Sequence, residues 1–152
     1  MPARTWILTG SPENFAATSA RDFSVIGLKE GRRRQALEIE PAERIVFYLT
    51  KRMVFAASAL IAGELYEDRT PIWPGKPGRA DPYPWRFPLE PELVLEEPAW
   101  IPAETLAGEL EHIRKWPAEH WKLAFQGQIR AVSDADAQTL CERLAAAAAV
   151  SV

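Results

Sequence analysis

Apolar residues along this chain are grouped in short runs that predict brief strands and helices. Residues 5–9 (TWILT) are bulky and mostly apolar, which is typical of a β-strand. The run ends at Gly10-Ser11-Pro12, where Ser11 stands at the position of a helix N-cap and Pro12 at that of a first helical residue. A short helix over residues 12–19 is therefore expected. Thirteen prolines oppose long helices over most of the chain, because proline lacks a backbone donor and fixes φ.

Residues 44–50 (RIVFYLT) give the clearest strand signal in the sequence. Alternation with a period of two separates this segment into two faces. One face carries Ile45, Phe47 and Leu49, and the other carries Val46, Tyr48 and Thr50. Because both faces are mostly apolar, we expect this strand to lie in the middle of a sheet.

The remaining strands and helices are predicted from weaker patterns. Strands are expected over residues 54–65, 86–95 and 128–132, a helical turn over 32–39 and an amphipathic helix over 103–113. The alanine run within 54–65 also permits a helix. The prolines within 86–95 favour an edge position, where a strand needs no hydrogen-bond donor toward a neighbour.

The C-terminal segment is expected to form a helix capped by Ser133. Asp136 stands at the third helical position, where a carboxylate is favourable to the helix dipole. Its buried stripe is expected to comprise Leu140, Cys141 and Leu144. The whole order of elements shows no βαβ repetition, so it predicts the α+β class rather than a parallel Rossmann sheet. We expect a small mixed β-barrel flanked by short helices, in a single domain over residues 1–152.

The net charge of −3 argues against a general nucleic-acid coat, but the charge is unevenly distributed. Residues 1–76 carry 11 basic and 9 acidic groups, whereas residues 77–152 carry 7 and 12, so positive charge gathers in the first half. The densest basic cluster comprises Lys29, Arg32, Arg33 and Arg34. Such a cluster would concentrate an anionic ligand despite the negative total. A solvated surface turn is the alternative interpretation.

The sequence lacks the patterns typical of an enzyme, a metal site or a membrane protein. His112 and His120 have neither a known ligand spacing nor a cysteine partner nearby, and Cys141 is the only cysteine. There is no G-x-S-x-G nucleophile turn. No apolar run approaches the roughly 20 residues that a membrane span needs. We therefore expect a cytoplasmic, non-enzymatic protein without a metal ion or cofactor.

Several short segments, taken in chain order, resemble the EVE domain family. They are W-I-L-T at 6–9 with S-x-E-N-F at 11–15, Gly27-Leu28 ahead of the basic stretch and Pro41, R-I-V-F-Y-L at 44–49, E-L-Y-E-D at 64–68, W-P at 73–74, Y-P-x-R at 83–86, and W-x(3)-F-x-G-x-x-R at 121–130. Each motif is short, but their shared order and spacing span about residues 5–144. The chain departs from the family at Ile26, where many members have tryptophan. It also departs at Pro41-Ala42-Glu43, where the family has P-G-D and the lost glycine suggests a different turn conformation.

The resemblance implies a PUA-like pseudo-barrel, related to the ASCH and YTH domains, with a pocket for a modified base of RNA or DNA. An extruded base offers a flat face for stacking and a polar edge for hydrogen bonds. The implied ligand-binding residues are Ser11, Asn14, Gly27, Tyr48, Trp73, Trp121 and Phe125. The residues expected to contact phosphate are Arg32, Arg33, Arg34 and Arg86. Helix capping by Ser11 and plain core packing of the aromatic residues are the structural alternatives.

Three functions follow from these observations. The first is recognition of a modified nucleobase in DNA or RNA, as the resemblance implies. The second is binding of a free nucleoside or metabolite without a polymer, which the acidic total and Ile26 favour. The third is hydrolysis of the kind found among ASCH-like relatives, and it ranks last because no nucleophile–base pair is recognisable.

Overall fold

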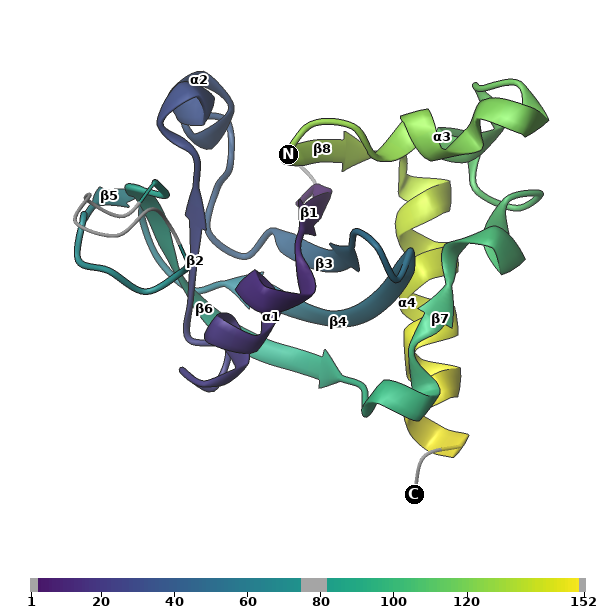
Figure 1. Ribbon diagram of the computed structural model, residues 1–152, viewed down its shortest axis with the longest axis horizontal. Helices are drawn as coiled ribbons and strands as arrows, with labels where there is room; N and C mark the ends of the chain where they lie inside the picture. Colours follow the sequence, from purple (N-terminus) through teal and green to yellow (C-terminus); the bar gives the residue numbers. More distant parts are fainter. Residues whose placement is uncertain (1–2, 75–81, 151–152) are drawn as a thin grey trace.

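A mixed β-sheet frames the protein in the computed structural model, which describes residues 3–74 and 82–150 (Figure 1). The strands are β1 (Thr5–Gly10), β2 (Val25–Leu28), β3 (Arg44–Leu49), β4 (Val54–Ile61), β5 (Tyr66–Glu67), β6 (Trp85–Val94), β7 (Ile101–Pro102) and β8 (Ile129–Val132). The α-helices are α1 (Pro12–Ser19), α2 (Arg33–Ala36), α3 (Glu111–Arg114) and α4 (Asp134–Val150). Short 3₁₀ segments are η1 (Glu30–Arg32), η2 (Glu97–Ala99), η3 (Ala103–Leu106) and η4 (Ala118–Phe125).

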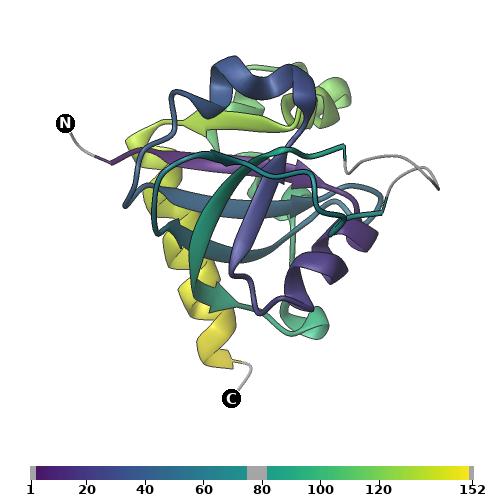
Figure 2. The same cartoon turned by 90° about the vertical axis from the view of Figure 1, so that its left-hand side faces the viewer.

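The sheet curls into a partial barrel (Figure 2). Its strands follow the order β2-β6-β4-β3-β1-β8, with β5 paired to β6 and β7 paired to β4. Strands β1 and β3 are parallel, and every other pair in the described residues is antiparallel. The predicted α+β class with short flanking helices is therefore confirmed.

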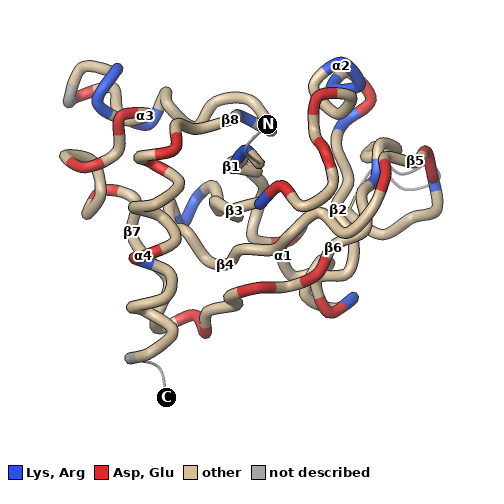
Figure 3. The backbone as a smooth tube through the Cα atoms, turned by 180° about the vertical axis from the view of Figure 1, so that it is seen from behind, with Lys and Arg blue, Asp and Glu red and all other residues tan. Residues whose placement is uncertain are grey.

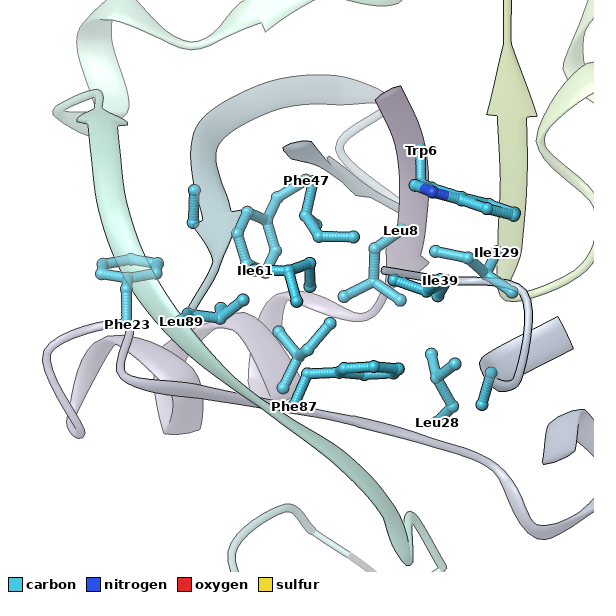
Figure 4. Close-up of a cluster of buried hydrophobic side chains, with 14 of the residues drawn as sticks. Trp6, Leu8, Phe23, Leu28, Ile39, Phe47, Ile61, Phe87, Leu89 and Ile129 are labelled. Carbon is cyan, nitrogen blue, oxygen red and sulfur yellow. The ribbon is translucent and has the colours of Figure 1, made fainter. Parts of the chain in front are cut away.

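Strand β3 lies between β1 and β4, which confirms that it is a central strand. Its alternating side chains contribute to two large clusters of the core. Ile45 and Phe47 join an inner cluster enclosed by the curled sheet, in which side chains from several strands point toward one another (Figure 4). Val46 and Tyr48 join an outer cluster, where α4 contributes Leu140 and Leu144. The apolar character of both faces is thus explained by burial on both sides.

Two helix starts agree with the sequence analysis. At α1, the Asn14 N–H donates to the Ser11 hydroxyl at 3.1 Å, which satisfies one of the free donors of the first turn. At α4, the Asp136 N–H donates to the Ser133 hydroxyl at 3.1 Å. The Asp136 carboxylate also accepts the N–H groups of Glu111 and His112 at 2.8 and 2.9 Å. One buried side chain therefore connects the beginnings of α3 and α4.

The predicted helix over residues 103–113 is wrong, because this segment forms η3 and then α3 with a break between them. Leu110 has an extended backbone (φ −86°, ψ 123°) in the break. Gly108 lowers the helix propensity there by about 1 kcal/mol relative to alanine. Asp136 receives the first amides of α3, so a new helix begins at Glu111. The apolar residues that suggested one continuous helix are buried by two short helices and the break between them.

The predicted edge position of the strand over residues 86–95 is also wrong. Strand β6 pairs with β4 and β5 on one side and with β2 on the other. Pro91 lies where the register of β4 shifts between Ser58 and Ala59, so a β-bulge accommodates the missing donor. The segment 54–65 forms a strand rather than a helix and ends at Ile61.

Two side chains connect β8 to the β2 side of the barrel, at opposite ends of the strand order. The Gln128 amide accepts from the backbone N–H of Lys29 at 2.7 Å and donates to the Gly27 carbonyl at 3.2 Å. Gln35 donates to the Ile129 carbonyl at 3.3 Å. These bonds replace the strand pairing that would close a complete barrel.

Glu43 is a buried carboxylate that ties the first strand to the turn before β3. It accepts hydrogen bonds from Trp6 Nε1 at 2.9 Å, from the Glu40 N–H at 2.9 Å and from the Arg4 backbone N–H at 3.0 Å. Burial acts to raise the pKa of Glu43, but these hydrogen bonds together hold the pKa below its usual value. The preceding Ala42 has a φ of 73°, the left-handed conformation usual for glycine. Alanine therefore occupies a strained position in this turn.

We expect Glu43→Gln to lower the free energy of unfolding by about 2 kcal/mol at neutral pH, because it weakens several hydrogen bonds to a buried charged acceptor. The folded-state pKa is lowered, so the contribution of Glu43 is present above 4.5 and is lost as the pH falls below that value. Urea unfolding at pH values above and below 4.5 measures the difference in the free energy of unfolding between the variant and wild type. This difference should become smaller in acid. Glu104→Gln, at an exposed position of η3, is the matched control. Equal losses in the two variants would contradict the role of Glu43.

Candidate functional site

A pocket of about 420 Å³ opens where β1 ends and α1 begins. We call it the outer pocket; its polar lining includes Thr9, Ser11, Asn14, Lys29, Arg32, Thr50, Tyr83 and Gln128. An inner cavity of about 40 Å³ shares Thr9, Ser11, Asn14, Tyr83 and Gln128 with it. The apolar walls of the inner cavity come from Leu8, Phe15, Ile26, Phe47, Leu49 and Trp73. The site therefore has a polar entrance and an apolar interior.

Gly27 allows two aromatic residues to approach the strand that forms one wall. A Cβ atom at residue 27 would lie 2.6 Å from the Trp73 ring and 2.8 Å from both the Cβ and the carbonyl oxygen of Tyr83. Since one of these atoms belongs to the backbone, a larger residue would displace the wall. Gly27 thus shapes the site through its lack of a side chain.

The Trp73 ring is held in place on several sides. Its Nε1 donates to the Thr18 hydroxyl at 2.9 Å, and its ring meets the Tyr83 ring edge-on with centroids 5.8 Å apart. The Arg86 guanidinium carbon lies 5.2 Å from the centroid of the Trp73 ring. The resulting wall is preorganised before any ligand binds.

Asn14 and Ser11 stand at the shared boundary of the outer pocket and the inner cavity. The Asn14 side-chain amide donates to the Tyr83 hydroxyl at 2.8 Å, which links α1 to the aromatic wall. Ser11 caps α1, so the structural alternative considered for it is observed. Both residues also line the outer pocket, which leaves the amide oxygen of Asn14 as a polar group beside it.

Tyr48 and Phe125 are brought together as a stacked pair, with centroids 4.0 Å apart and an interplanar angle of 7°. Phe125 lines the outer pocket, and Tyr48 belongs to the outer cluster and also lines the inner cavity. Burial raises the pKa of Tyr48 to about 12, so its hydroxyl stays protonated at neutral pH. Trp121 meets Phe125 edge-on at 6.4 Å and is absent from the described lining of both cavities. Its position is that of a supporting core residue.

The four predicted phosphate contacts separate in space. Arg32 lines the outer pocket, Arg34 is exposed on α2, and the Arg33 guanidinium lies 5.6 Å from the Trp85 ring. Arg86 is only 1% exposed, and it donates to the carbonyl groups of Tyr83 and Thr70. The burial of Arg86 corrects the expectation that it contacts a phosphate. Its two hydrogen bonds instead connect Thr70 with Tyr83.

Sequence reasoning missed three of the polar groups at the site. Tyr83 had a signal in the Y-P-x-R motif, but its position opposite Asn14 follows from the tertiary structure. Lys29 was recognised as part of the basic cluster but not as a lining residue of the pocket, and Gln128 carried no local signal. Among the described residues that line the two cavities there is no carboxylate, so Lys29 and Arg32 give the entrance a positive charge.

The described residues contain neither a cluster of metal-ligating side chains nor a helix with the length and apolar character of a membrane span. No protein-family model and no curated protein matches the sequence.

Solved structures share the fold at low sequence identity. The Mmi1 YTH domain has a TM-score of 0.66 at 11% identity and covers 95% of this chain and 90% of that chain. The YTH domain of Zygosaccharomyces rouxii MRB1, solved with N6-methyladenosine RNA, has a TM-score of 0.65 at 16% identity over 93% and 86%. Rpa0253 from Rhodopseudomonas palustris has a TM-score of 0.62 at 11% identity over 95% and 94%. The chain therefore has the same fold as the YTH domains, which confirms the predicted PUA-like fold.

We expect Thr18→Val to destabilise the aromatic wall, because it leaves the buried Trp73 Nε1 without its acceptor. The loss should be about 1–3 kcal/mol in the free energy of unfolding. Thr18→Ser keeps the hydroxyl and should lose less. Denaturant unfolding followed by tryptophan fluorescence compares the two variants, and identical midpoints would show that this hydrogen bond is unimportant.

Proposed function

We propose that this protein is a non-catalytic module that binds a modified nucleobase of DNA or RNA. The heterocycle would occupy the outer pocket, and its small substituent would point into the inner cavity. The observation that carries this proposal is the division of one site into a larger polar chamber and a smaller apolar one.

The volumes of the two chambers suit this division. The outer pocket, at about 420 Å³, lies within the range of about 300–1,000 Å³ typical of small-molecule sites. The inner cavity, at about 40 Å³, has room for about three water molecules, since each needs about 10–15 Å³. It is too small for a heterocyclic ring but accepts a substituent of a few heavy atoms.

The chemistry of the lining matches the two surfaces of a base. Phe125 and Tyr83 provide aromatic surface beside the outer pocket, and stacking on such a surface contributes about 1–3 kcal/mol per base. Asn14 and Gln128 carry amides that can form hydrogen bonds with a base edge. Trp73 and Leu49 give the inner cavity an apolar lining that favours an alkyl substituent over a charged one.

The fold comparisons support this proposal without identifying the base. One structure of similar fold contains N6-methyladenosine RNA, and the Mmi1 YTH domain has also been solved with RNA. The resemblance of the sequence motifs to the EVE family supports the same class of ligand.

Gly10 offers a direct test, because it lines both chambers and a Cβ added there would have no heavy atom within 4 Å. It lies two residues beyond Leu8, so its side chain would project to the same face of β1. Gly10→Leu should therefore fill the site while leaving the fold intact. We expect it to weaken binding of the preferred nucleobase at least tenfold, with little change in the melting temperature.

The binding assay is calorimetric titration with adenosine, N6-methyladenosine, cytidine, 5-methylcytidine and 5-hydroxymethylcytidine, each free and within a short oligonucleotide. Gly108→Leu is the matched control, since residue 108 also has open space around it and lies outside both chambers. The proposal fails if no modified form binds more tightly than its parent, or if Gly10→Leu binds as well as wild type.

A further inference from the structure

A second concavity, of about 540 Å³, adjoins the outer pocket along β8. We call it the basic groove, because its lining includes the cationic residues Arg4, Arg32, Lys115 and Arg130. Glu38 is the one carboxylate in its described lining. Figure 3 shows basic residues on the segments around it, near the start of β1, beside α2, at β8 and near α3. The groove is therefore a site of concentrated positive charge on a chain whose net charge is −3.

The guanidinium groups of Arg32 and Arg130 converge above Gly127. A Cβ atom at residue 127 would lie 3.6 Å from Arg32 Nη2 and 3.7 Å from Arg130 Nε. Gly127 has a φ of 85°, a conformation that glycine adopts without strain. The glycine thus leaves free the space in which the two cations approach one another.

Neutral partners hold these two arginines. Arg32 donates to the Gln35 side-chain oxygen at 3.1 Å, and Arg130 donates to the Gln126 carbonyl at 2.7 Å. Within the described part of the chain, neither guanidinium forms an ion pair. By contrast, five other arginines have a glutamate oxygen within 3.3 Å: Arg4, Arg44, Arg52, Arg69 and Arg143. The charges of Arg32 and Arg130 are therefore available to an external anion.

The positive charge of the groove also acts on a buried histidine beside it. Burial is the main cause that lowers the pKa of His112, and the nearby charges of Lys115 and Arg130 lower it further. His112 therefore remains neutral at neutral pH. Lys115, Arg130 and Arg32 supply the charge of the groove, while Arg4 is engaged with Glu43.

Arg32 and Gly127 line the groove and the outer pocket alike, so the two concavities are neighbours. We propose that the groove binds the backbone of a single-stranded nucleic acid, with a phosphate beside the bound nucleotide held between Arg32 and Arg130. Arginine is well suited to this contact, because its planar donors match phosphate oxygens. A single strand suits the site, because its base can enter the pocket without the energetic cost of being extruded from a duplex stack. This inference rests on the proposed function and selects a polymer ligand over a free nucleoside.

The test compares Arg130→Gln and the double variant Arg32→Gln/Arg130→Gln with Arg34→Gln, an exposed arginine of α2 outside the described groove lining. The probes are fluorescein-labelled oligouridylate and oligodeoxythymidylate, titrated between about 50 and 200 mM salt. The double variant should bind roughly tenfold more weakly at the lowest salt, and the slope of log affinity against log salt should fall by about 0.7 for each lost phosphate contact. Arg130→Lys, which keeps the charge, should recover most of the affinity.

Nucleoside titrations separate this inference from the proposed function. Arg130→Gln should bind the preferred free nucleoside as wild type does, because Arg130 is outside the described lining of the outer pocket and the phosphate contact is absent from that ligand. Groove-dependent oligonucleotide binding without any nucleobase selectivity would refute the base pocket and keep the groove assignment. Equal losses in Arg34→Gln and Arg130→Gln, or an unchanged salt slope in the double variant, would overturn the inference. Thermal unfolding of each variant confirms that it is folded before binding is compared.

Discussion

The buried amide of Gln128 connects two parts of the sheet that no strand pairing joins. Its bonds to Lys29 and Gly27 hold the end of β2 against the beginning of β8. Without them the barrel would have an open seam, since β2 and β8 are the end strands of the sheet order. This contact sets the position of Gly27 on one side of the seam and of Gly127 on the other. The two concavities of the molecule depend on that spacing.

The same seam explains why a protein of net charge −3 can present a local cationic surface. Arg32 approaches the seam from the β2 side and Arg130 from β8, and neutral groups hold both side chains. Elsewhere in the described chain, arginines such as Arg44 and Arg143 are neutralised by glutamates. The charges of Arg32 and Arg130 therefore stand together at the seam, where they can attract an anion despite the acidic total.

The outer pocket illustrates how two functions of a residue can coincide. Ser11 caps α1 and also lines the entrance, so the capping and binding interpretations are compatible. Asn14 likewise holds Tyr83 while lining the pocket. Such shared roles make the walls rigid, because each lining group is already fixed by the fold. A rigid pocket loses less conformational entropy when a ligand binds.

Local chemistry in the sequence determined the elements with strong signals. The Ser11-Pro12 helix start and the two apolar faces of β3 follow from capping and alternation, which act over a few residues. Contacts between distant segments decided the rest. Asp136 divides a predicted helix, a bulge in β6 next to Pro91 admits this proline into an inner strand, and burial removes Arg86 from solvent. The meeting of Arg32 with Arg130 belongs to this second class, because about a hundred residues separate them and only the closure of the barrel brings their charges together.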